Sequence, residues 1–394
     1  MRLPRVAVIH NRYQQPGGED VVFASEAELL ERNGHEVVRY ELDNDAIENM
    51  GRVALARTTV WNGAAYAELR RLFASHRPDI AHFHNTFPLV SPAGYYAARR
   101  EGVAVVQTLH NFRLACPNAL FYRDGHVCED CSGKVVPWPG VLHACYRGSR
   151  AASGVTAAML AVHRLRGTWS RMVDVYIALT AFARERFVAH GLPAERIAVK
   201  PNFVPADASP VGEHRGAFAL YAGRLVAEKG VQTMLDAWDR ARLPSGFSLK
   251  VVGSGPLESL RDVPRPGVEW LGHQPAACVA ALMRDAAFLV FPSEWYEGFP
   301  LTLAEAFAAG LPVIASREGA AAEIVEHGRT GRHFRSGDPA DLADQLEWAS
   351  THDAEMARMG QAARAVFEAK YTAERNYTLL LDSYRAATAR LATR

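Results

Sequence analysis

The sequence lacks the features that mark several large classes of protein. It contains no run of about 18 apolar residues, the length that a membrane-spanning helix needs. It also shows no internal repeat and no low-complexity segment, which argues against solenoid and fibrous chains. With 394 residues, 49% of them hydrophobic, the chain is long enough for two globular domains, each with its own core.

The net charge is small, and cysteines are few. The 44 basic and 43 acidic residues leave a formal net charge of +1, so we expect no nucleic-acid partner. The N-terminal residues pass straight into an apolar strand without a signal-peptide pattern, and we therefore expect a cytoplasmic protein. In that reducing compartment the 5 cysteines favour metal binding over disulfides, because four of them lie between Cys116 and Cys145.

Strand-like apolar runs alternate with helical segments along almost the whole chain. This rhythm is typical of parallel sheets with helices on both faces. The segment 200–210, rich in proline and small residues, separates two such series and has the composition of a linker. The expected strands are 6–9, 36–42, 80–84, 103–108, 175–179 and 197–200 in the first series, and 217–221, 248–252, 268–271, 287–291 and 313–315 in the second.

The fold class that follows is α/β, with two doubly wound parallel-sheet domains facing across a cleft. We expect an N-terminal domain over 1–203, with a cysteine-rich insert at about 112–148, and a C-terminal domain over 204–372. Ligands of such sheets bind beyond the carboxyl ends of the strands, so the site is expected there.

The segment 293–316 carries the most specific pattern. Glu297 lies in a loop just before an expected helix, and Glu305 lies about two turns inside that helix. A phosphate cradle between two carboxylates suits a ligand with both phosphates and hydroxyls, such as a nucleotide sugar. The alternative is a helix with a solvated glutamate and an unrelated loop acid. The residues of the helix start, whose free backbone N–H groups can face an anion, are Gly298, Phe299, Pro300 and Leu301.

The first expected helix of the chain follows paired glycines, Gly17 and Gly18. Such a pair lets backbone N–H groups approach a ligand at a helix N-terminus, although a plain tight turn is the alternative. The spacing differs from a dinucleotide fingerprint, so NAD is not expected. His110 ends a strand of the same domain and is a candidate for the cleft, with His84 a weaker one; an isolated histidine is more often structural.

The second series has a matching arrangement. A strand ends just before Arg224, and Lys229 follows at the next helix start. These two cations can hold a diphosphate and stabilise the charge that develops when a sugar–phosphate bond breaks. A surface cluster of Arg224, Glu228 and Lys229 is the alternative. The strand ends at Gly253 and His273 would line the same nucleotide pocket, unless they are ordinary turns.

Taken in order along the chain, these motifs resemble those of the retaining nucleotide-sugar glycosyltransferases of family 4, which have the GT-B fold. The resemblance covers nearly the whole chain and is most specific over 291–316. It implies two Rossmann-like domains, the second of which binds the nucleotide sugar, and a last helix, 373–394, that crosses back to the N-terminal domain. The matching positions are Gly17, Gly18, His110, Pro201, Asn202, Gly223, Arg224, Lys229, Gly230, Gly253, Glu297 and Glu305.

The resemblance also implies a role for each matching side chain. Arg224 and Lys229 would hold the donor diphosphate, Glu297 would contact the donor sugar, and Glu305 would contact the ribose hydroxyls. The N–H groups of 298–301 would complete the phosphate cradle. In the N-terminal domain, the loop at Gly18 would approach the phosphates, and His110 would bond near the transferred sugar.

The expected activity is transfer of a sugar from a nucleoside diphosphate sugar, with UDP or GDP as the carrier, to an acceptor hydroxyl with retention of configuration. By resemblance, the acceptor is a surface polysaccharide or a lipid-linked glycan. No catalytic metal is expected, because Arg224 and Lys229 can neutralise the phosphates, and Asp43-Asn44-Asp45 is interpreted as a turn. The alternatives are a non-catalytic nucleotide-sugar-binding protein and a sugar-nucleotide epimerase of similar fold.

The insert offers a possible metal site of its own. Its cysteines, separated by 11, 2 and 13 residues, are Cys116, Cys128, Cys131 and Cys145. One Cys-x2-Cys pair with two outer cysteines can form a tetrahedral structural zinc site, which a loop-rich segment without its own core would need. Buried reduced thiols, or disulfides formed on isolation, are the alternatives. The insert lacks a long recognition helix, so a DNA-reading finger is not expected.

A basic stretch follows the insert. The span 131–173 contains no Asp or Glu, and its apolar residues Leu160, Val162, Leu165 and Trp169 are interleaved with arginines on an expected helix. A basic amphipathic helix can rest on anionic lipid, which would place the protein at the inner face of the membrane. The alternative is a basic helix that packs by its apolar side and leaves its charges in solvent.

Overall fold

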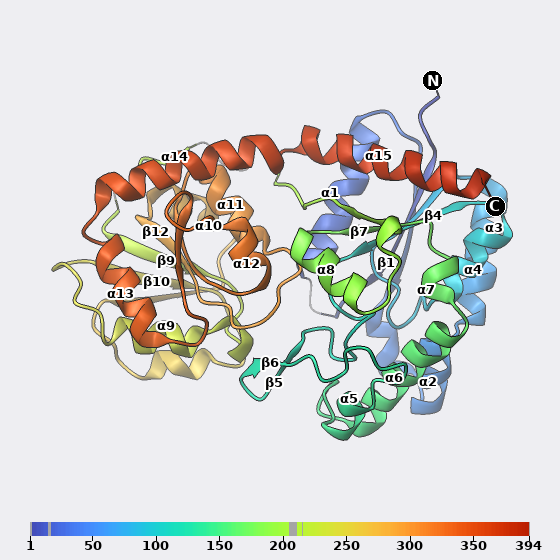
Figure 1. Ribbon diagram of the computed structural model, residues 1–394, viewed down its shortest axis with the longest axis horizontal. Coiled ribbons are helices and arrows are strands. Elements are labelled where there is room, and N and C mark those ends of the chain that lie inside the picture. The colour runs from blue at the N-terminus through green and yellow to red at the C-terminus, as the bar shows by residue number, and fades with distance from the viewer. Residues whose placement is uncertain (1, 15–16, 205–210, 215, 394) are drawn as a thin grey trace. The chain divides into compact units, whose positions relative to one another are not determined.

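The computed structural model describes residues 2–14, 17–204, 211–214 and 216–393. The chain forms two compact units (Figure 1). The first comprises Met1–Phe121, Glu129–Pro201 and Asn376–Arg394, and the second comprises Tyr122–Cys128 and Asn202–Arg375. Pro16 and most of the expected linker, 205–210, lie outside the described residues.

The first unit is built on a parallel sheet in the order β2-β1-β3-β4-β7-β8. Its strands form because short apolar runs, most of them fully buried, are bounded by turn residues. After β2 the chain returns past β1 to β3, so the order reverses between β1 and β3. The strands are β1 Val6–Arg12, β2 Val37–Asp43, β3 Ile80–Phe83, β4 Ala104–Leu109, β7 Val175–Ala178 and β8 Ile197–Val199.

Helices cover this sheet, and the last helix of the chain is among them. Leu380, Tyr384 and Ala387 of α15 lie in the same buried cluster as Val6 and Phe23. The helices are α1 Gly18–Arg32, α2 Arg52–Val60, α3 Gly63–His76, α4 Ala93–Arg100, α5 Trp138–Leu142, α6 Arg150–Leu165, α7 Thr168–Arg171, α8 Ala181–Ala189 and α15 Ala373–Ala392, with the short 3-10 turns η1 Asn44–Asn49 and η2 Ala194–Arg196.

The second unit repeats the plan with the order β11-β10-β9-β12-β13-β14, again parallel. Here the order reverses between β9 and β12. The strands are β9 Phe218–Ala222, β10 Ser248–Val252, β11 Val268–Gly272, β12 Phe288–Phe291, β13 Val313–Ser316 and β14 Gly331–Phe334. The helices are η4 Ala227–Lys229, α9 Val231–Trp238, η5 Glu258–Asp262, α10 Ala276–Asp285, α11 Leu301–Ala309, α12 Gly319–Ile324, α13 Pro339–Ala349 and α14 Asp353–Lys370.

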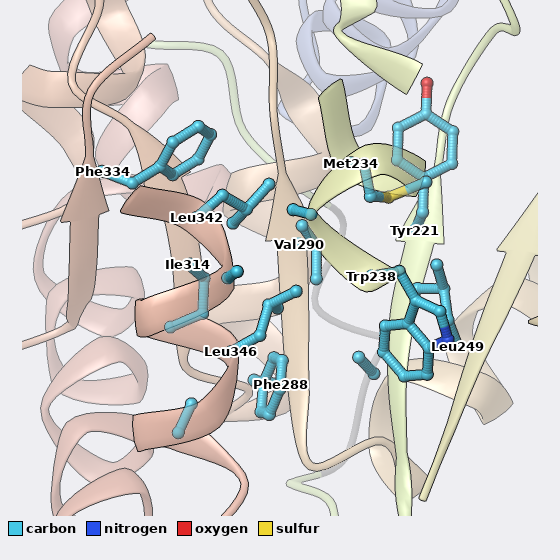
Figure 2. Packing of buried hydrophobic residues seen from close by; sticks show 14 of the residues in the cluster. Tyr221, Met234, Trp238, Leu249, Phe288, Val290, Ile314, Phe334, Leu342 and Leu346 are labelled. Carbon is cyan, nitrogen blue, oxygen red and sulfur yellow. The ribbon is translucent and has the colours of Figure 1, made fainter. Parts of the chain in front are cut away.

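The core of the second unit is formed where helices pack on the central strands. Figure 2 shows Leu346 of α13 beside Phe288 of β12, and Trp238 of α9 beside Leu249 of β10, within one buried cluster. These apolar side chains are almost fully buried, and β12 is therefore held rigidly at the centre of the sheet. The loop that follows β12 is anchored on this core.

Two elements differ from the sequence expectation. The sequence predicts no strand at β14, because Gly331-Arg-His-Phe334 has no apolar run. The strand forms because Gly331 allows close approach: a Cβ there would lie 2.0 Å from the backbone oxygen of Val313. The insert also contains a short antiparallel hairpin, β5 Tyr122–Arg123 with β6 His126–Val127, which has too few residues for a periodic signal.

The expected lipid-facing helix is wrong in its details. Leu160 and Trp169 are 0% and 5% exposed, so they belong to the protein core and cannot contact lipid. On α6, Arg150 is exposed, but Arg164 is half-buried and donates to the backbone oxygens of Lys134 and Leu114. Leu165 alone of the four expected residues is exposed. Among the described residues, no helix has the length and hydropathy needed to cross a bilayer.

Candidate active site

The loops after β9 and β12 meet at the reversal point of the second sheet. Gly230 has a φ of 66°, and a Cβ at this position would lie 2.0 Å from the backbone oxygen of Pro292. The Glu294 amide donates to the backbone oxygen of Glu228 at 2.9 Å. These contacts require glycine at 230, and they hold Lys229 against the loop that carries Glu297.

Lys229 and Glu297 form the centre of this site. The Lys229 Nζ donates to Glu297 Oε1 at 2.6 Å, and the Ser293 hydroxyl donates to the same oxygen at 2.6 Å. Glu297 is 7% exposed, and its Oε2 accepts no hydrogen bond from the described residues. The Lys229 ammonium also lies 5.6 Å from the ring centroid of Phe291 and 5.9 Å from that of Trp295. One carboxylate oxygen is therefore anchored, while the other remains available to a ligand hydroxyl.

The helix that follows differs in detail from the expected phosphate cradle. Helix α11 begins at Leu301 with Pro300 as its N-cap, so Glu305 lies just over one turn inside it rather than two. Pro300 has no amide hydrogen, and the cradle can use only the N–H groups of the other three residues. Burial raises the pKa of the Glu305 carboxyl, whose oxygens accept no hydrogen bond within the described part of the chain. The helix ends at Gly310, whose φ of 72° is the left-handed conformation that glycine favours after a helix.

Arg224 is exposed, and its side chain makes no ion pair with any described residue, so the alternative of a surface cluster with Glu228 does not form. Its backbone oxygen accepts the hydroxyl of Tyr221 at 2.8 Å, which fixes the loop. A Cβ at Gly253 would lie 1.8 Å from the backbone oxygen of Gly223, so the loops after β9 and β10 pack tightly. His273, at the end of the outer strand β11, is exposed.

The first unit places histidines at the reversal point of its own sheet. His110 follows β4, and its Nε2 lies 3.0 Å from Nδ1 of His84, which follows β3. Burial, reinforced by the nearby His10 and Lys200, lowers the pKa of His110 to about 3, so the ring is neutral. The structure thus brings together His110 and the weaker sequence candidate, His84.

The glycine loop after β1 is held by its own side chains. Asp20 Oδ2 accepts the amide of Gly17 at 2.7 Å, and Asp20 Oδ1 lies 2.9 Å from His10 Nε2. Gly17 has extended backbone, φ −134°, and a Cβ there would meet only Asp20, at 3.9 Å. The alternative explanation, that a tight turn requires glycine, is therefore wrong for Gly17. Gly18 is the first residue of α1, so any anion here would meet the N-terminus of that helix.

Comparison with known proteins agrees with this arrangement. The family model described as Glycosyl transferase 4-like domain matches residues 17–202, and the model described as Glycosyl transferases group 1 matches residues 217–352. Together they span both sheets and both reversal points. The chain belongs to the family 4 glycosyltransferases.

Individual relatives in this family support the same placement. Glycogen synthase of Mycobacterium tuberculosis is 29% identical over 264 residues, which is 64% of each chain. The amylovoran biosynthesis glycosyltransferase AmsK of Erwinia amylovora is 27% identical over 229 residues, 53% of this chain and 55% of AmsK. The chain thus spans less than two thirds of the length of the curated relatives it matches.

Solved structures establish the fold. HepE of Anabaena, solved in complex with UDP, superposes with a TM-score of 0.68 and 16% identity over 95% of this chain and 98% of HepE. With both sheets parallel and Rossmann-like, the glycosyltransferase chain has the GT-B fold, and the expected fold class is confirmed.

The sequence did not reveal several polar residues of this glycosyltransferase. In the first unit, Glu19 accepts hydrogen bonds from the Tyr13 hydroxyl at 2.9 Å and the Asn111 amide at 2.6 Å. Glu26 and Lys200 form an ion pair with both side chains 0% exposed. The only sequence signals are a glutamate on the apolar side of α1 and a lysine that continues an apolar strand.

Burial and local contacts show how part of the cysteine insert packs. Cys116 and Cys131 are each 8% exposed, and Cys128 and Cys145 are half-buried. A Cβ at Gly140 would lie 3.0 Å from the Pro117 side chain, and the Cys145 amide donates to the Gly140 oxygen at 2.9 Å. The segments of Cys116 and Cys145 are therefore packed together.

The alternative metal candidate of the N-terminal half is a turn. The Asp45 amide donates to the Asp43 side chain at 2.9 Å, which makes Asp43 the cap of η1. The turn interpretation of Asp43-Asn44-Asp45 is confirmed.

Proposed function

We propose that the chain is a retaining glycosyltransferase that moves a sugar from a nucleoside diphosphate sugar, UDP or GDP, to an acceptor hydroxyl. The observation that carries this proposal is the Lys229–Glu297 pair at the reversal point of the second sheet. It combines a cation for the phosphates with a carboxylate oxygen left for sugar hydroxyls. HepE, which shares the fold, was solved with UDP and with UDP-glucose.

Each side chain of the site has a part in this reaction. Lys229 and Arg224 would neutralise the diphosphate and the charge that develops as the sugar leaves. Glu297 would accept a hydroxyl of the donor sugar on Oε2, and Glu305 would meet the ribose. The amides of Gly298, Phe299 and Leu301 would contribute at the phosphates, with Gly253 and His273 lining the nucleotide side. With two cations in these roles, the proposal assigns no step to a catalytic metal.

The N-terminal unit would then serve the acceptor, with His110 beside the transferred sugar and the loop of Gly17 and Gly18 near the phosphates. We propose domains over 1–203 and 204–372, with the helix of 373–394 returning to the first. The acceptor we propose is a surface polysaccharide or a lipid-linked glycan, since AmsK is named for amylovoran biosynthesis.

Product analysis of the purified protein tests this function. With UDP- and GDP-sugars and no acceptor, we expect slow release of free sugar and nucleoside diphosphate. NMR of the first-formed sugar should show the anomeric configuration of the donor. An epimerised donor with the nucleotide still attached would identify an epimerase, and binding without any turnover would identify a sensor; either result would overturn the proposal.

We further propose that the insert holds a structural zinc ion through Cys116, Cys128, Cys131 and Cys145. The burial of Cys116 and Cys131 and the packing of Pro117 on Gly140 support this proposal. Metal analysis should find about one zinc per chain, and a chelator should lower the melting temperature. Cys145→Ser should release the metal, whereas Cys278→Ser, outside the insert, should retain it. Zinc-free protein of unchanged melting temperature would contradict the proposal.

A membrane-facing surface is proposed on the same unit, on residues other than those expected. Val135, Val136, Trp138 and Leu142 are each 47% or more exposed, and the surrounding span 131–173 is basic and free of acid. Exposed tryptophan and valine beside lysine and arginine suit the surface of anionic lipid. The protein would then work in the cytoplasm at the inner face of the membrane.

Vesicle co-sedimentation tests this surface. Binding should require anionic lipid and should fall with Trp138→Ser. The matched control is Trp61→Ser, which alters another exposed tryptophan outside the basic span. Equal binding to neutral vesicles, or equal loss with both variants, would contradict the proposed surface.

A further inference from the structure

A buried polar chain runs behind His110 in the first unit. Lys200 Nζ donates to Glu26 Oε1, and both side chains are 0% exposed. The second oxygen, Glu26 Oε2, lies 3.7 Å from Nε2 of His84, and the other nitrogen of that ring lies 3.0 Å from His110 Nε2. The chain therefore connects a buried carboxylate to the histidine at the end of β4.

The positions of the hydrogens in this polar chain follow from counting the donors and acceptors on Glu26 and His84. Glu26 is paired with an ammonium and acts only as an acceptor. His84 Nε2 and Glu26 Oε2 are buried, and neither has a partner at hydrogen-bond distance among the described residues. A hydrogen on His84 Nε2 would point at the carboxylate, whereas a lone pair there would face its negative charge. The favoured His84 tautomer therefore carries its hydrogen on Nε2 and leaves Nδ1 as an acceptor.

The tautomer of His84 then determines which nitrogen of His110 carries the hydrogen. Since His84 Nδ1 accepts, His110 Nε2 must donate, and a neutral ring has only one N–H. His84 is neutral because burial lowers its pKa well below 6.5, and the neighbouring histidines and Lys200 lower it further. A protonated His84, which could donate from both nitrogens, is thereby disfavoured.

We infer that Glu26, acting through His84, is a positioning residue that fixes His110 as its Nε2–H tautomer and leaves His110 Nδ1 as a hydrogen-bond acceptor. No described residue hydrogen-bonds to this Nδ1 atom. It suits a ligand hydroxyl that donates a hydrogen, and its relevance to sugar transfer rests on the function proposed above. The tautomer itself does not depend on that function.

A metal ion is the other reading of this cluster, because Glu26, His82 and His84 bring potential ligand atoms within 4.8 Å of one another. Two contacts disfavour it. Both ring nitrogens of His82 already have partners, Tyr384 at 2.9 Å and Thr108 at 2.8 Å. The Lys200 ammonium lies on Glu26 and would repel a cation.

Histidine 15N NMR measures the tautomer directly. The signals of His110 can be assigned because they are missing from the spectrum of His110→Asn. The wild-type protein should then show the hydrogen on Nε2 of His110. In Glu26→Gln, the Gln oxygen would accept from Lys200 and its amide would donate to His84 Nε2, so the tautomers of both His84 and His110 should reverse. His82→Gln is the matched control, since it alters a neighbouring buried histidine outside the chain, and His110 should stay unchanged.

A wild-type His110 with its hydrogen on Nδ1, or with a mixture of tautomers, would overturn the inference. An unchanged tautomer in folded Glu26→Gln would do so too, as would a reversal in His82→Gln. If Glu26→Gln does not fold, the wild-type spectrum still decides. Zinc or another divalent ion that shifts the His82 and His84 signals in stoichiometric amounts would support the metal reading instead.

Activity supplies a second readout. In Glu26→Gln we expect kcat to fall about 10- to 100-fold, because a donor would replace the acceptor at His110. Binding of the nucleoside diphosphate should change far less than kcat, because Arg224 and Lys229, its proposed cationic ligands, lie in the second unit. If the wild-type protein transferred no sugar, the proposed function would be wrong, but the tautomer measurement would remain valid. In Glu26→Gln, a raised dissociation constant for the nucleoside diphosphate with unchanged kcat would count against the positioning role.

Discussion

Each of the two units holds a lysine–glutamate pair, and the two pairs have different surroundings. In the first unit, Lys200 and Glu26 are both 0% exposed, and the glutamate faces only protein groups. In the second, Lys229 and Glu297 are 17% and 9% exposed in their side chains, and one carboxylate oxygen has no protein partner. The same two residue types can thus form a closed network that sets the tautomer of a histidine, or an open pair with one carboxylate oxygen left for a ligand.

The buried pair should dominate stability. Lys200→Met leaves the Glu26 charge buried without a partner, and we expect it to lower the free energy of unfolding by about 3–5 kcal/mol. Urea denaturation measures this change, with Lys370→Met on an exposed helix end as the control. A double variant, Lys200→Met with Glu26→Gln, should recover much of the loss. A single variant as stable as the control would show that the pair is not buried as described.

The open pair should dominate activity instead. Glu297→Gln keeps the shape but removes the charge that pairs with Lys229, and we expect donor turnover to fall about 100-fold or more with little loss of stability. The control is Glu269→Gln, an exposed glutamate on strand β11 of the same sheet. Turnover equal to that of the control would remove Glu297 from the site.

Loop packing around the open pair gives a smaller effect. Gly253→Ala would place a Cβ 1.8 Å from the Gly223 oxygen at a φ of 142°, and we expect a loss of about 2–3 kcal/mol together with weaker nucleotide binding. Gly246→Ala also has a positive φ, 82°, but no atom within 4 Å, and should cost about 1 kcal/mol without affecting binding. Equal losses would mean that strain, rather than the close approach of the loops, limits this position.

The closed network should also make stability depend on pH. Burial lowers the pKa of His110 to about 3 from 6.5, and the pKa values of His82 and His84 lie well below 6.5. The unfolded chain therefore binds protons on these rings more readily than the folded chain. Their stabilisation is present above pH 6.5 and is lost as the pH falls below it. For His110 the loss continues toward pH 3, at about 1.4 kcal/mol per pH unit.

Urea unfolding between about pH 7 and pH 5 measures this slope. His110→Asn should reduce it by about one proton, whereas His273→Asn, on an exposed loop end, should leave it unchanged. A slope that His110→Asn does not alter would contradict the burial of the ring.

The sequence predicted most strands of both sheets because their apolar runs are bounded by glycine and proline. The sequence-based prediction failed where the structure depends on contacts between residues that are far apart in the sequence. Strand β14 depends on the approach that Gly331 permits, and α6 hides Leu160, which periodicity alone placed on an amphipathic face. A local spacing could suggest Glu297 and Lys229 separately, but their pairing joins loops 68 residues apart. Glu26 and Lys200, 174 residues apart, give no local signal of their contact.

Nucleotide binding tests the central claim most directly. Titration calorimetry with UDP and GDP should show binding of at least one of them to the wild-type protein. Lys229→Ala should weaken it roughly 10- to 100-fold, because a charge-assisted contact to the phosphates is lost. Lys250→Ala, which alters a lysine packed on the Phe218 ring of the same sheet, should bind like the wild type. Absence of binding to either nucleotide, or equal affinity in Lys229→Ala and the wild type, would contradict the account.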